Sequence, residues 1–389
     1  MCLACQKHGR LMRNFGDMGI TEFQLDLMDG AQRFVREKSP MASVRAAMET
    51  ESGYNKNIWA EMGALGWLGI AIPEKFGGIG LSMGEVVPVV EALGRYMLHS
   101  PFGATVLAAQ ALLVGGTENQ KANILPKISA GQAATLALSE HNGDWDLRAI
   151  DATATQTGSG YTLSGTKTFV QDLPAAQTII VSVKLDGHVR LFVINADAIP
   201  VDHWRRERII DDIKRSYELT LDGITVPKSS LMDIDRTDAA LECIHVSANL
   251  LASAEITGAA QATIDYTVEY LKTRKQFGKL IGSFQALKHP IVDDYMEYEK
   301  ARSLLYAAAN SFTKQWPPSD KKGEIAVRMT KVQSGKALSF AADRSIQFHG
   351  GFGFTYDCDA QLYRRRAIWL TSQFGDGQYH KKKLADLIL

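Results

Sequence analysis

A string of residues in the last third of the sequence combines a fixed cation with aromatic and amide side chains. It runs from Arg274 to Gly278 as Arg-Lys-Gln-Phe-Gly, and Phe284 and Gln285 follow it closely. Arg274 offers a planar fork of donors that suits a pyrophosphate. Phe277 and Phe284 offer apolar faces for an aromatic cofactor, and Gln285 offers both donors and an acceptor. The string therefore indicates a site for a phosphorylated aromatic ligand.

A second string lies closer to the C-terminus and is rich in glycine. It runs from Gln347 to Phe354 as Gln-Phe-His-Gly-Gly-Phe-Gly-Phe. Gln347 adds paired donors and acceptors, and Gly350-Gly351 let the backbone approach a ligand closely. A basic helix end and a glycine helix stop would explain either string alone, but they explain the two together much less well. Together the strings favour a ligand site.

Composition limits the remaining classes of function. The 389 residues carry 43 Lys+Arg and 43 Asp+Glu, and the pI is near 7.1. This balance argues against an extended nucleic-acid surface or a polybasic membrane anchor. The longest apolar stretch, Ala104–Gly116, is too short to span a bilayer, and the N-terminus lacks the apolar core of a signal peptide. We therefore expect a globular cytoplasmic protein that binds neither nucleic acid nor a membrane.

The four cysteines predict neither a disulfide framework nor a metal site. Cys2 and Cys5 form a CxxC beside His8, but no second CxxC follows, so we expect no metal. Cys243 and Cys358 are predicted to be buried thiols. The sequence also contains no P-loop, Rossmann glycine triad, HExxH or nucleophile elbow. The two ligand strings belong to none of these motifs.

The first part of the chain is predicted to be helical. Residues 1–20 lack a clear period and are expected to form a disordered leader, and a helical pattern begins at Thr21. The further predicted helices are Asn57–Leu65, Ser82–Tyr96, Phe102–Leu113 and Glu118–Ile128. Thr117 is a good N-cap for the last of them. These elements define an N-terminal helical domain at residues 21–132.

The period changes near Ala133, where short strands with tight turns begin. The predicted strands include Lys167–Val170, Thr178–Val183, Arg190–Ile194 and Tyr217–Leu221. They indicate an antiparallel β-barrel or sandwich at residues 133–232. Residues 233–389 then predict a C-terminal four-helix bundle, from the long segments Arg236–Thr273, Phe284–Gln315 and Gly323–Phe348 and a terminal pair of helices. The fold class is therefore α+β and multidomain.

The two strings, in this order and within a helix–β–helix chain, resemble the acyl-CoA dehydrogenase family over nearly all of the sequence after residue 20. The resemblance implies that FAD pyrophosphate and adenosine are held by Arg274, Phe277, Phe284, Gln285, Gln347, Gly350 and Gly351. Part of this set is expected to come from a neighbouring subunit of a dimer or tetramer. The resemblance also implies dehydrogenation of an acyl-CoA to the trans-2-enoyl-CoA in fatty acid β-oxidation, with electrons passing to an electron-transfer flavoprotein.

The same resemblance places the flavin ring against the β domain. Ser139 matches the family's Thr in a Thr-Glu pair, where the hydroxyl and nearby backbone meet the flavin. Residues 167–171 match the family's Lys-x-Trp-Ile-Thr, so Phe169 keeps the aromatic wall and Gln171 replaces a hydroxyl. After Glu140 the chain reads His-Asn-Gly-Asp-Trp-Asp, where the family usually has Pro-Gly-x-Gly-Ser-Asp. We expect Ser139, Phe169 and Gln171 to contact the flavin.

The chemistry of this family needs a carboxylate that accepts the α-proton while flavin N5 accepts the β-hydride. The family commonly has a Glu before Gly-Thr near the C-terminus, but residues 373–377 here read Gln-Phe-Gly-Asp-Gly. Asp376 is the nearest carboxylate. A minority of the family carries its Glu early in the first bundle helix, where the matching residue here is Ala248. Neither family position is acidic in this sequence.

Glu255 interrupts an apolar stripe in that helix. The stripe comprises Leu241, Ile244, Ala248, Leu251, Glu255, Ala259 and Ala262, which fall on one face at helical spacing. Burial there would raise the pKa of Glu255 toward that of a useful base. The alternative is a buried Glu paired with an Arg or a backbone group. The candidate catalytic residues are therefore Glu255 and Asp376.

These departures are similar to one branch of the family. The acidic and Arg residues that grip substrate in the first bundle helix are absent from residues 246–249. With this absence, and with Phe374, Asp376 and His380, the sequence resembles the small subunits of bacterial two-subunit acyl-CoA dehydrogenases. These enzymes are of the pimeloyl-CoA and steroid side-chain degrading kind. The alternative function is thus a non-catalytic or FAD-sharing subunit of a heterotetramer. A flavin monooxygenase or nitroalkane-type oxidase is a less favoured alternative.

Two basic runs, Arg364–Arg366 and Lys381–Lys383, could meet the phosphates of CoA. Such runs are more often solvated helix faces, and we favour that interpretation. The neutral total charge is compatible with FAD and CoA, because Arg274 can meet a pyrophosphate without a global excess of positive charge.

Overall fold

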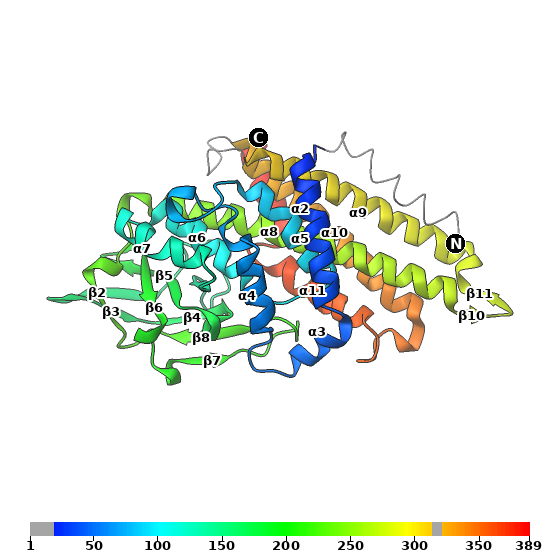
Figure 1. Ribbon diagram of the computed structural model, residues 1–389, viewed down its shortest axis with the longest axis horizontal. Helices are drawn as coiled ribbons and strands as arrows, with labels where there is room; N and C mark the ends of the chain where they lie inside the picture. The colour runs from blue at the N-terminus through cyan, green and yellow to red at the C-terminus, as the bar shows by residue number, and fades with distance from the viewer. Residues whose placement is uncertain (1–18, 313–320) are drawn as a thin grey trace.

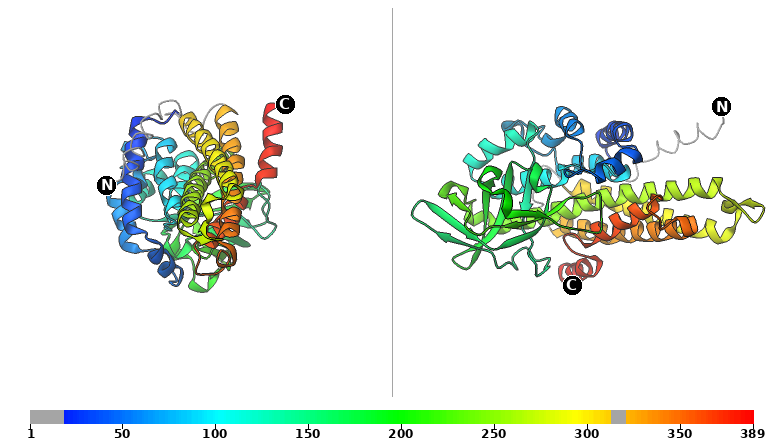
Figure 2. Two further views of the ribbon diagram at one scale, coloured as in Figure 1. Left: turned by 90° about the vertical axis from the view of Figure 1, so that its right-hand side faces the viewer. Right: turned by 90° about the horizontal axis from the view of Figure 1, so that it is seen from below.

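The computed structural model describes residues 19–312 and 321–389. The sheets lie toward one end of the long axis and the long helices of the bundle extend to the other end (Figure 1). The N-terminal helices cover one side of the bundle, and the last helix, α12, lies on the opposite side (Figure 2). The helix–β–helix order predicted from the sequence is confirmed.

The N-terminal part contains six α-helices among its described residues. They are α2 (Glu22–Lys38), α3 (Met41–Met48), α4 (Lys56–Ala64), α5 (Met83–Arg95), α6 (Phe102–Gly115) and α7 (Glu118–Ser129). Capping boxes at Thr21, Ser82 and Thr117 start α2, α5 and α7. Each hydroxyl accepts a hydrogen bond from a backbone N–H of the first turn, and a Gln or Glu side-chain oxygen accepts one from the backbone N–H of the capping residue. The starts predicted at Thr21 and Thr117 are thus confirmed.

The middle part contains two sheets. Its strands are β1 (Ala134–Ala137), β2 (Thr153–Gln156), β3 (Gly160–Ser164), β4 (Thr166–Gln171), β5 (Thr178–Leu185), β6 (His188–Asn195), β7 (Trp204–Arg206), β8 (Ser216–Thr220) and β9 (Thr225–Pro227). One sheet has the order β1-β5-β2-β3-β9 with β6 on β5, and the other has the order β4-β8-β7.

The first sheet is mixed, so the predicted purely antiparallel arrangement is wrong. β5 pairs in parallel with both β1 and β2. β1 was not foreseen as a strand, because its Ala-Thr-Leu-Ala sequence is buried throughout and shows no alternation. A long connection separates β1 from β5, and parallel pairing requires such a crossover.

The C-terminal part is a bundle of α8 (Thr237–Thr273), α9 (Gln285–Ser311), α10 (Lys321–His349) and α11 (Ala360–Ser372), followed by α12 (Gly377–Ile388). α8 packs against α5, α6, α9, α10 and α11, and its buried residues lie on every side of the helix. A helix apolar all round is a core helix, and α8 therefore forms the centre of the molecule. A short hairpin, β10 (Lys275–Gln276) and β11 (Lys279–Leu280), follows it.

The remaining predictions concern the cysteines, the leader and membrane-spanning helices, and some of them fall on residues outside the described part of the chain. Cys243 and Cys358 are buried free thiols, as predicted. The predicted leader falls outside the described residues apart from Gly19 and Ile20, and Ile20 is buried against the N-terminal helices. Cys2, Cys5 and His8 also lie outside the described residues. No helix in the described part of the chain has both the length and the apolar character needed to cross a bilayer.

Candidate functional site

A cavity of about 100 Å³ lies where the N-terminal helices, the sheets and the bundle meet. We call it the main cavity. Its apolar wall comes from α5, α6 and α8 and includes Val90, Leu93, Leu98, Phe102, Ala104, Leu107, Ala248, Leu251 and Ala252. Ala248 is the position where some family members carry a Glu, and here its methyl group lines the cavity. The main cavity therefore offers an apolar volume beside α8.

A smaller cavity of about 50 Å³ adjoins the main cavity. This side cavity shares five lining residues with the main cavity: Leu136, Phe169, Gln171, Gln373 and Phe374. Ser139 and Thr168 line the side cavity alone. The three residues predicted to meet the flavin ring, Ser139, Phe169 and Gln171, are thus brought together at the junction of the two cavities.

The walls of the side cavity carry features that fit a flavin. The Thr168 hydroxyl is buried and has no hydrogen-bond partner among the described residues. Phe169 lines both cavities and is 42% exposed. It adopts φ = 55°, a strained value for an aromatic residue. Its ring lies 5.9 Å from that of Trp369. An unpaired hydroxyl beside an open aromatic face suits a polar, planar ring system.

The strand that carries Phe169 is held by a buried ion pair. Lys167 Nζ donates to Glu140 Oε1 at 2.6 Å and to Leu138 O at 3.3 Å. Burial lowers the pKa of Lys167 to about 8, although Glu140 opposes the shift. Glu140 also accepts bonds from the backbone of Asp151 and Ala152. This network fixes the loop after β1 to β4 and so positions Ser139 and Phe169.

Glu255 lines the main cavity but is held by two cations. Its Oε1 lies 2.8 Å from Lys214 Nζ and 2.6 Å from Arg366 Nη1. Burial alone would raise the pKa of Glu255, but Lys214 and Arg366 outweigh burial and lower the pKa to about 2. The predicted rise in pKa is therefore wrong. The paired, buried Glu that the sequence left as an alternative is the arrangement present.

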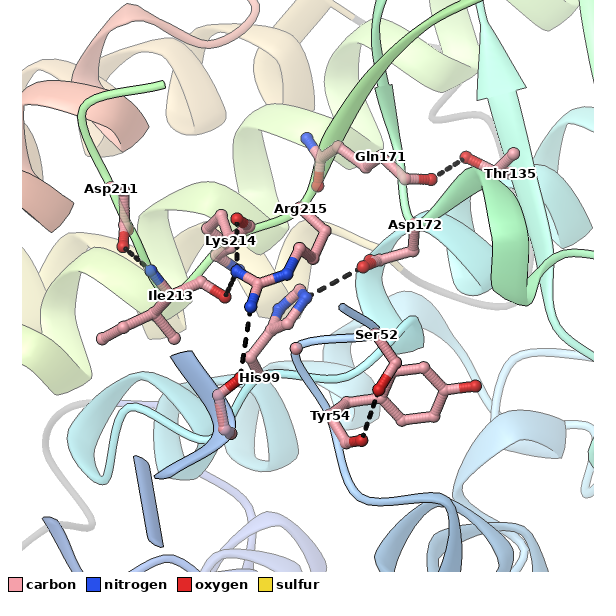
Figure 3. Close-up of polar contacts among 12 residues, drawn as sticks. Ser52, Tyr54, His99, Thr135, Gln171, Asp172, Asp211, Ile213, Lys214 and Arg215 are labelled. Atoms are coloured by element: carbon pink, nitrogen blue, oxygen red, sulfur yellow. Dashed lines mark hydrogen bonds and ion pairs between the residues drawn. The ribbon is translucent and has the colours of Figure 1, made fainter. Parts of the chain in front are cut away.

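A second buried carboxylate of the main cavity is also paired. Asp172 Oδ1 lies 2.8 Å from His99 Nε2, and both side chains are almost fully buried. Figure 3 shows the His99 ring and the Asp172 carboxylate turned toward each other beside Lys214 and Arg215. Among the described residues that line the main cavity, Asp172 and Glu255 are the acidic ones. Both are engaged with a basic side chain.

Asp376 has a structural role in this arrangement. It is the N-cap of α12, and its Oδ1 accepts a bond from Tyr379 N at 2.8 Å. Asp376 is not among the residues that line the main or the side cavity. The residues that do reach both cavities from this segment are Gln373 and Phe374.

The segment Gln373–Phe374 is fixed by polar residues that sequence reasoning missed. Lys331 Nζ donates to Leu370 O at 2.9 Å and to Gln373 O at 2.6 Å. Asn249 Nδ2 donates to Phe374 O at 3.2 Å. Burial lowers the pKa of Lys331 to about 7. A lone Lys within a long helix gives no sequence signal of this role, because the carbonyl groups it meets lie on another element.

The predicted basic run at Arg364–Arg366 is only partly solvated, so its interpretation as a solvated helix face is wrong for one member. Arg366 is fully buried and pairs with Asp211 and Glu255. Arg365 pairs with Asp212 at 2.8 Å and remains partly exposed. Arg366 is the member of the run that faces α8, where it binds Glu255 beside the main cavity.

The other predicted FAD residues form a separate region at the outer end of the bundle. We call this region the bundle-end surface, and it comprises Arg274, Phe277, Phe284, Gln285, Gln347, Gly350 and Gly351. Phe277 occupies the β10–β11 turn with φ = 53° and is 88% exposed. Its ring meets that of Phe284 edge-on at 6.1 Å. A Cβ added to Gly350 or Gly351 would meet no atom within 4 Å. Gly350 has φ = 64°, a left-handed value that favours glycine. Neither packing nor a positive φ within this chain gives a reason for Gly351.

The two sequence strings come together at the bundle-end surface. His349 stacks on Tyr266 and Tyr270 of α8, with ring centroids 4.8 Å and 4.1 Å apart. Thr267 Oγ1 also donates to Ser345 Oγ at 2.8 Å. The end of α10 thus lies beside the end of α8, and both strings project from the same end of the bundle.

Within one chain the bundle-end surface lies far from both cavities. The β10–β11 hairpin lies at one tip of the long axis, whereas β4, which carries Phe169 and Gln171, lies toward the opposite end (Figure 1). Both regions fit parts of FAD by their chemistry: an unpaired hydroxyl and an open aromatic face in the side cavity, and an exposed arginine, exposed aromatic rings and open glycines at the bundle end.

Comparison with known families agrees with this geometry. The description "Acyl-CoA dehydrogenase, N-terminal domain" matches residues 21–132, and "Acyl-CoA dehydrogenase, C-terminal domain" matches residues 238–389. The fold is that of FAD-dependent oxidoreductases that act on acyl-CoA. The chain belongs to the acyl-CoA dehydrogenase family.

Individual relatives cover most of the chain. Acyl-CoA dehydrogenase FadE12 of Mycobacterium tuberculosis is 29% identical over 78% of this chain and 80% of its own length. Subunit CarC of the caffeyl-CoA reductase-Etf complex of Acetobacterium woodii is 26% identical over 91% of this chain and 95% of its own. The crystal structure of the ChsE4-ChsE5 complex from Mycobacterium tuberculosis superimposes with a TM-score of 0.82 at 25% identity, covering 94% of this chain and 97% of that chain. The chain is therefore a flavoprotein whose cofactor is FAD.

Proposed function

We propose that the chain oxidises an acyl-CoA thioester to the trans-2-enoyl-CoA, with the acyl group in the main cavity, and that the electrons pass to an electron-transfer flavoprotein. The observation that carries this proposal is the shared wall of the main and side cavities, formed by Phe169, Gln171 and Phe374 among others. Bound FAD would supply the hydride acceptor next to that wall. The similarity to CarC, a subunit of a complex named for Etf, supports the electron acceptor.

The chain's own residues would divide the binding of FAD between two subunits. Ser139, Phe169 and Gln171 would hold the flavin ring. The bundle-end surface of a neighbouring subunit would hold the pyrophosphate and adenosine, because the same surface of one chain lies at the other end of its long axis. We therefore propose an oligomer, either of identical chains or with a related subunit.

Glu255 is the proton acceptor in this proposal, because it is the carboxylate that α8 presents to the main cavity. Its Oε2 is 3.0 Å from Lys214 Nζ, and a carboxylate with a pKa of about 2 is a weak base. Glu255 becomes an effective base only when its pairing with Lys214 is relieved. Lys214 thus controls the basicity of Glu255.

Two variants test this assignment. Glu255→Gln should abolish reduction of bound FAD by an acyl-CoA, followed anaerobically by absorbance, while FAD stays bound. Lys214→Met should raise the pKa of Glu255 and move the pH profile of flavin reduction upward, since one of the two stabilising cations is gone. Glu91→Gln is the matched control, because Glu91 is also buried and paired, with Arg302 at 3.2 Å, but does not line the cavity. Unchanged reduction in Glu255→Gln would remove Glu255 from the mechanism.

A second candidate function is that of an FAD-sharing subunit without its own base. The observation that favours it is the pairing of both cavity carboxylates, Glu255 with Lys214 and Arg366, and Asp172 with His99. The similarity to one chain of the ChsE4-ChsE5 complex supports the role of an FAD-sharing subunit. In this case the chain's contribution is the bundle-end surface, which completes the FAD site of a related subunit.

The visible spectrum of the chain expressed alone separates the two candidates. A yellow oligomer that is bleached by acyl-CoA supports the first. A colourless protein that gains FAD only when a related subunit is added, and in which Glu255→Gln changes nothing, supports the second.

A further inference from the structure

The main cavity is lined by more polar groups than the proton acceptor Glu255 alone. Ser100, Asp172, Lys214 and Glu255 line the main cavity but not the side cavity. We call these four residues the polar wall. Glu255 comes from α8, which also supplies apolar residues of the same cavity. A bound acyl group would therefore meet both hydrocarbon and hydrogen-bonding groups.

Ser100 is the clearest member of this polar wall. It precedes α6, and its Oγ is buried without a hydrogen-bond partner among the described residues. A buried hydroxyl without a partner is costly, because it has lost its bonds to water and gained none in return. Native structures retain such groups mainly where a ligand or water satisfies them. The Ser100 hydroxyl thus indicates a polar atom in the ligand.

Lys214 adds a donor to the same wall. Its Nζ lies within 3.0 Å of both oxygens of Glu255. An ammonium group has three N–H donors, and the third has no acceptor among the described residues. Because Lys214 enters the cavity from the loop before β8 and Ser100 from the loop before α6, the two donors reach one small volume from different elements.

The charges of the wall define which polar group fits. Lys214 is already paired with Glu255, and Asp172 brings a further carboxylate that is bonded to His99. An additional carboxylate in the ligand would face two like charges, and like charges in a low-dielectric site repel strongly. A neutral oxygen would accept the free donors without adding charge.

We propose that the substrate is an acyl-CoA whose acyl group carries a neutral hydroxyl or carbonyl oxygen in addition to the thioester, and that Ser100 and Lys214 bind this oxygen. The inference rests on the proposed function, because it takes the main cavity as the acyl site. It makes Ser100 a specificity-determining residue, and an unsubstituted fatty acyl group a poorer ligand.

The test measures binding separately from turnover. The full chain with FAD bound, together with its partner subunit if assembly needs one, is reduced with dithionite so that no thioester can be oxidised. Matched straight-chain acyl-CoAs of several lengths are then titrated by calorimetry in three forms: with a terminal methyl group, a terminal alcohol and a terminal carboxylate. At the best-fitting length the alcohol should bind about tenfold more tightly than the methyl form, as expected for one hydrogen bond to a group otherwise left unpaired.

Ser100→Ala should remove most of this preference, and the alcohol should then bind only slightly more tightly than the methyl form, because Lys214 remains. Ser129→Ala is the matched control, since Ser129 Oγ is also buried without a partner but lies outside the main cavity. It should keep the wild-type preference.

Three results would overturn the inference: tightest binding of the methyl form, tightest binding of the carboxylate, or an unchanged preference in Ser100→Ala. None of them bears on whether flavin is reduced. Absence of flavin reduction by every thioester would instead contradict the proposed function and leave the binding result to stand alone.

Discussion

The main cavity and the bundle-end surface are built in opposite ways. Around the main cavity the ion pairs are largely buried and join elements far apart in sequence, as in the pairing of Arg366 with Asp211 and Glu255. At the bundle-end surface the side chains are exposed, with Phe277 at 88%. The first region is completed by this chain's own folding. We propose that a ligand or another subunit completes the second.

This difference predicts whether a substitution changes the stability of the chain or its FAD content. A change near the main cavity alters the stability of the chain itself, because buried polar groups there depend on one another. A change at the bundle-end surface should leave the chain's stability alone and appear only when FAD or a neighbouring subunit is present. The two regions can therefore be told apart by comparing unfolding with FAD content.

Arg366→Met should produce the largest loss of stability. It would leave Asp211 and Glu255 buried without Arg366, and breaking such a buried network typically costs about 3–5 kcal/mol of unfolding free energy. Urea unfolding of the two proteins measures the difference. Arg365→Met is the control on the adjacent residue, and its partly exposed pair with Asp212 should cost at most about 1 kcal/mol. Equal losses in the two variants would contradict the view of the main cavity as a prebuilt region.

Arg274→Ala should act at the opposite end of the molecule. The unfolding free energy of the chain should stay within about 0.5 kcal/mol of wild type, since Arg274 is exposed. FAD affinity should fall by about tenfold or more, the value of a hydrogen bond to a charged phosphate. Flavin absorbance after gel filtration measures the retained FAD. Lys272→Ala removes a neighbouring exposed cation, which pairs with Glu269, and should keep wild-type FAD content.

Lys331→Met should reveal the cost of burying a lysine in the main cavity region. The pKa of Lys331 is about 7 in the folded chain and near 10.5 when unfolded. Between these values the unfolded state binds a proton that the folded state has released, so the unfolding free energy of wild type rises with pH. Wild type should gain stability relative to Lys331→Met from pH 7 to 10, by up to about 1.4 kcal/mol per pH unit.

Thermal unfolding of the two proteins across that range measures the gain. Lys336→Met on the same helix is the control, because Lys336 is largely exposed and pairs with Glu297. A flat difference between wild type and Lys331→Met would show that Lys331 is not buried as a neutral or easily deprotonated amine.

Local patterns predicted most of the fold. The helices α2, α5 and α7 carry capping boxes within their own sequence. The bounds of α8 were predicted to within one residue because its apolar run is long. β1 was not predicted, because its pairing with β5 depends on a segment that is distant in the sequence. Register and parallel direction are non-local properties, which alternation within one segment does not encode.

The residues of the candidate site that lie in contiguous sequence strings could be predicted. The two strings placed Arg274 and Gly351 at one end of the bundle, and the family match placed Phe169 at the cavity. The partners of Glu255 were not predictable, since Lys214 and Arg366 come from a loop and a helix far away in sequence. Burial of Glu255 was correctly anticipated, but the direction of its pKa shift depended on those two unseen cations.

Asp376→Ala should have the smallest effect, and it tests whether the main cavity is the whole catalytic region. Asp376 caps α12, and loss of a cap typically costs about 1 kcal/mol of unfolding free energy. Asp376→Asn should restore most of that loss, because its side-chain oxygen can still accept the bond from Tyr379 N. Neither variant should change the rate of flavin reduction by acyl-CoA, because Asp376 lies outside both cavities. If Asp376→Asn kept its stability but lost flavin reduction, Asp376 and not Glu255 would be the proton acceptor, and the segment from Gln373 to Asp376 would have to move over the cavity during the reaction.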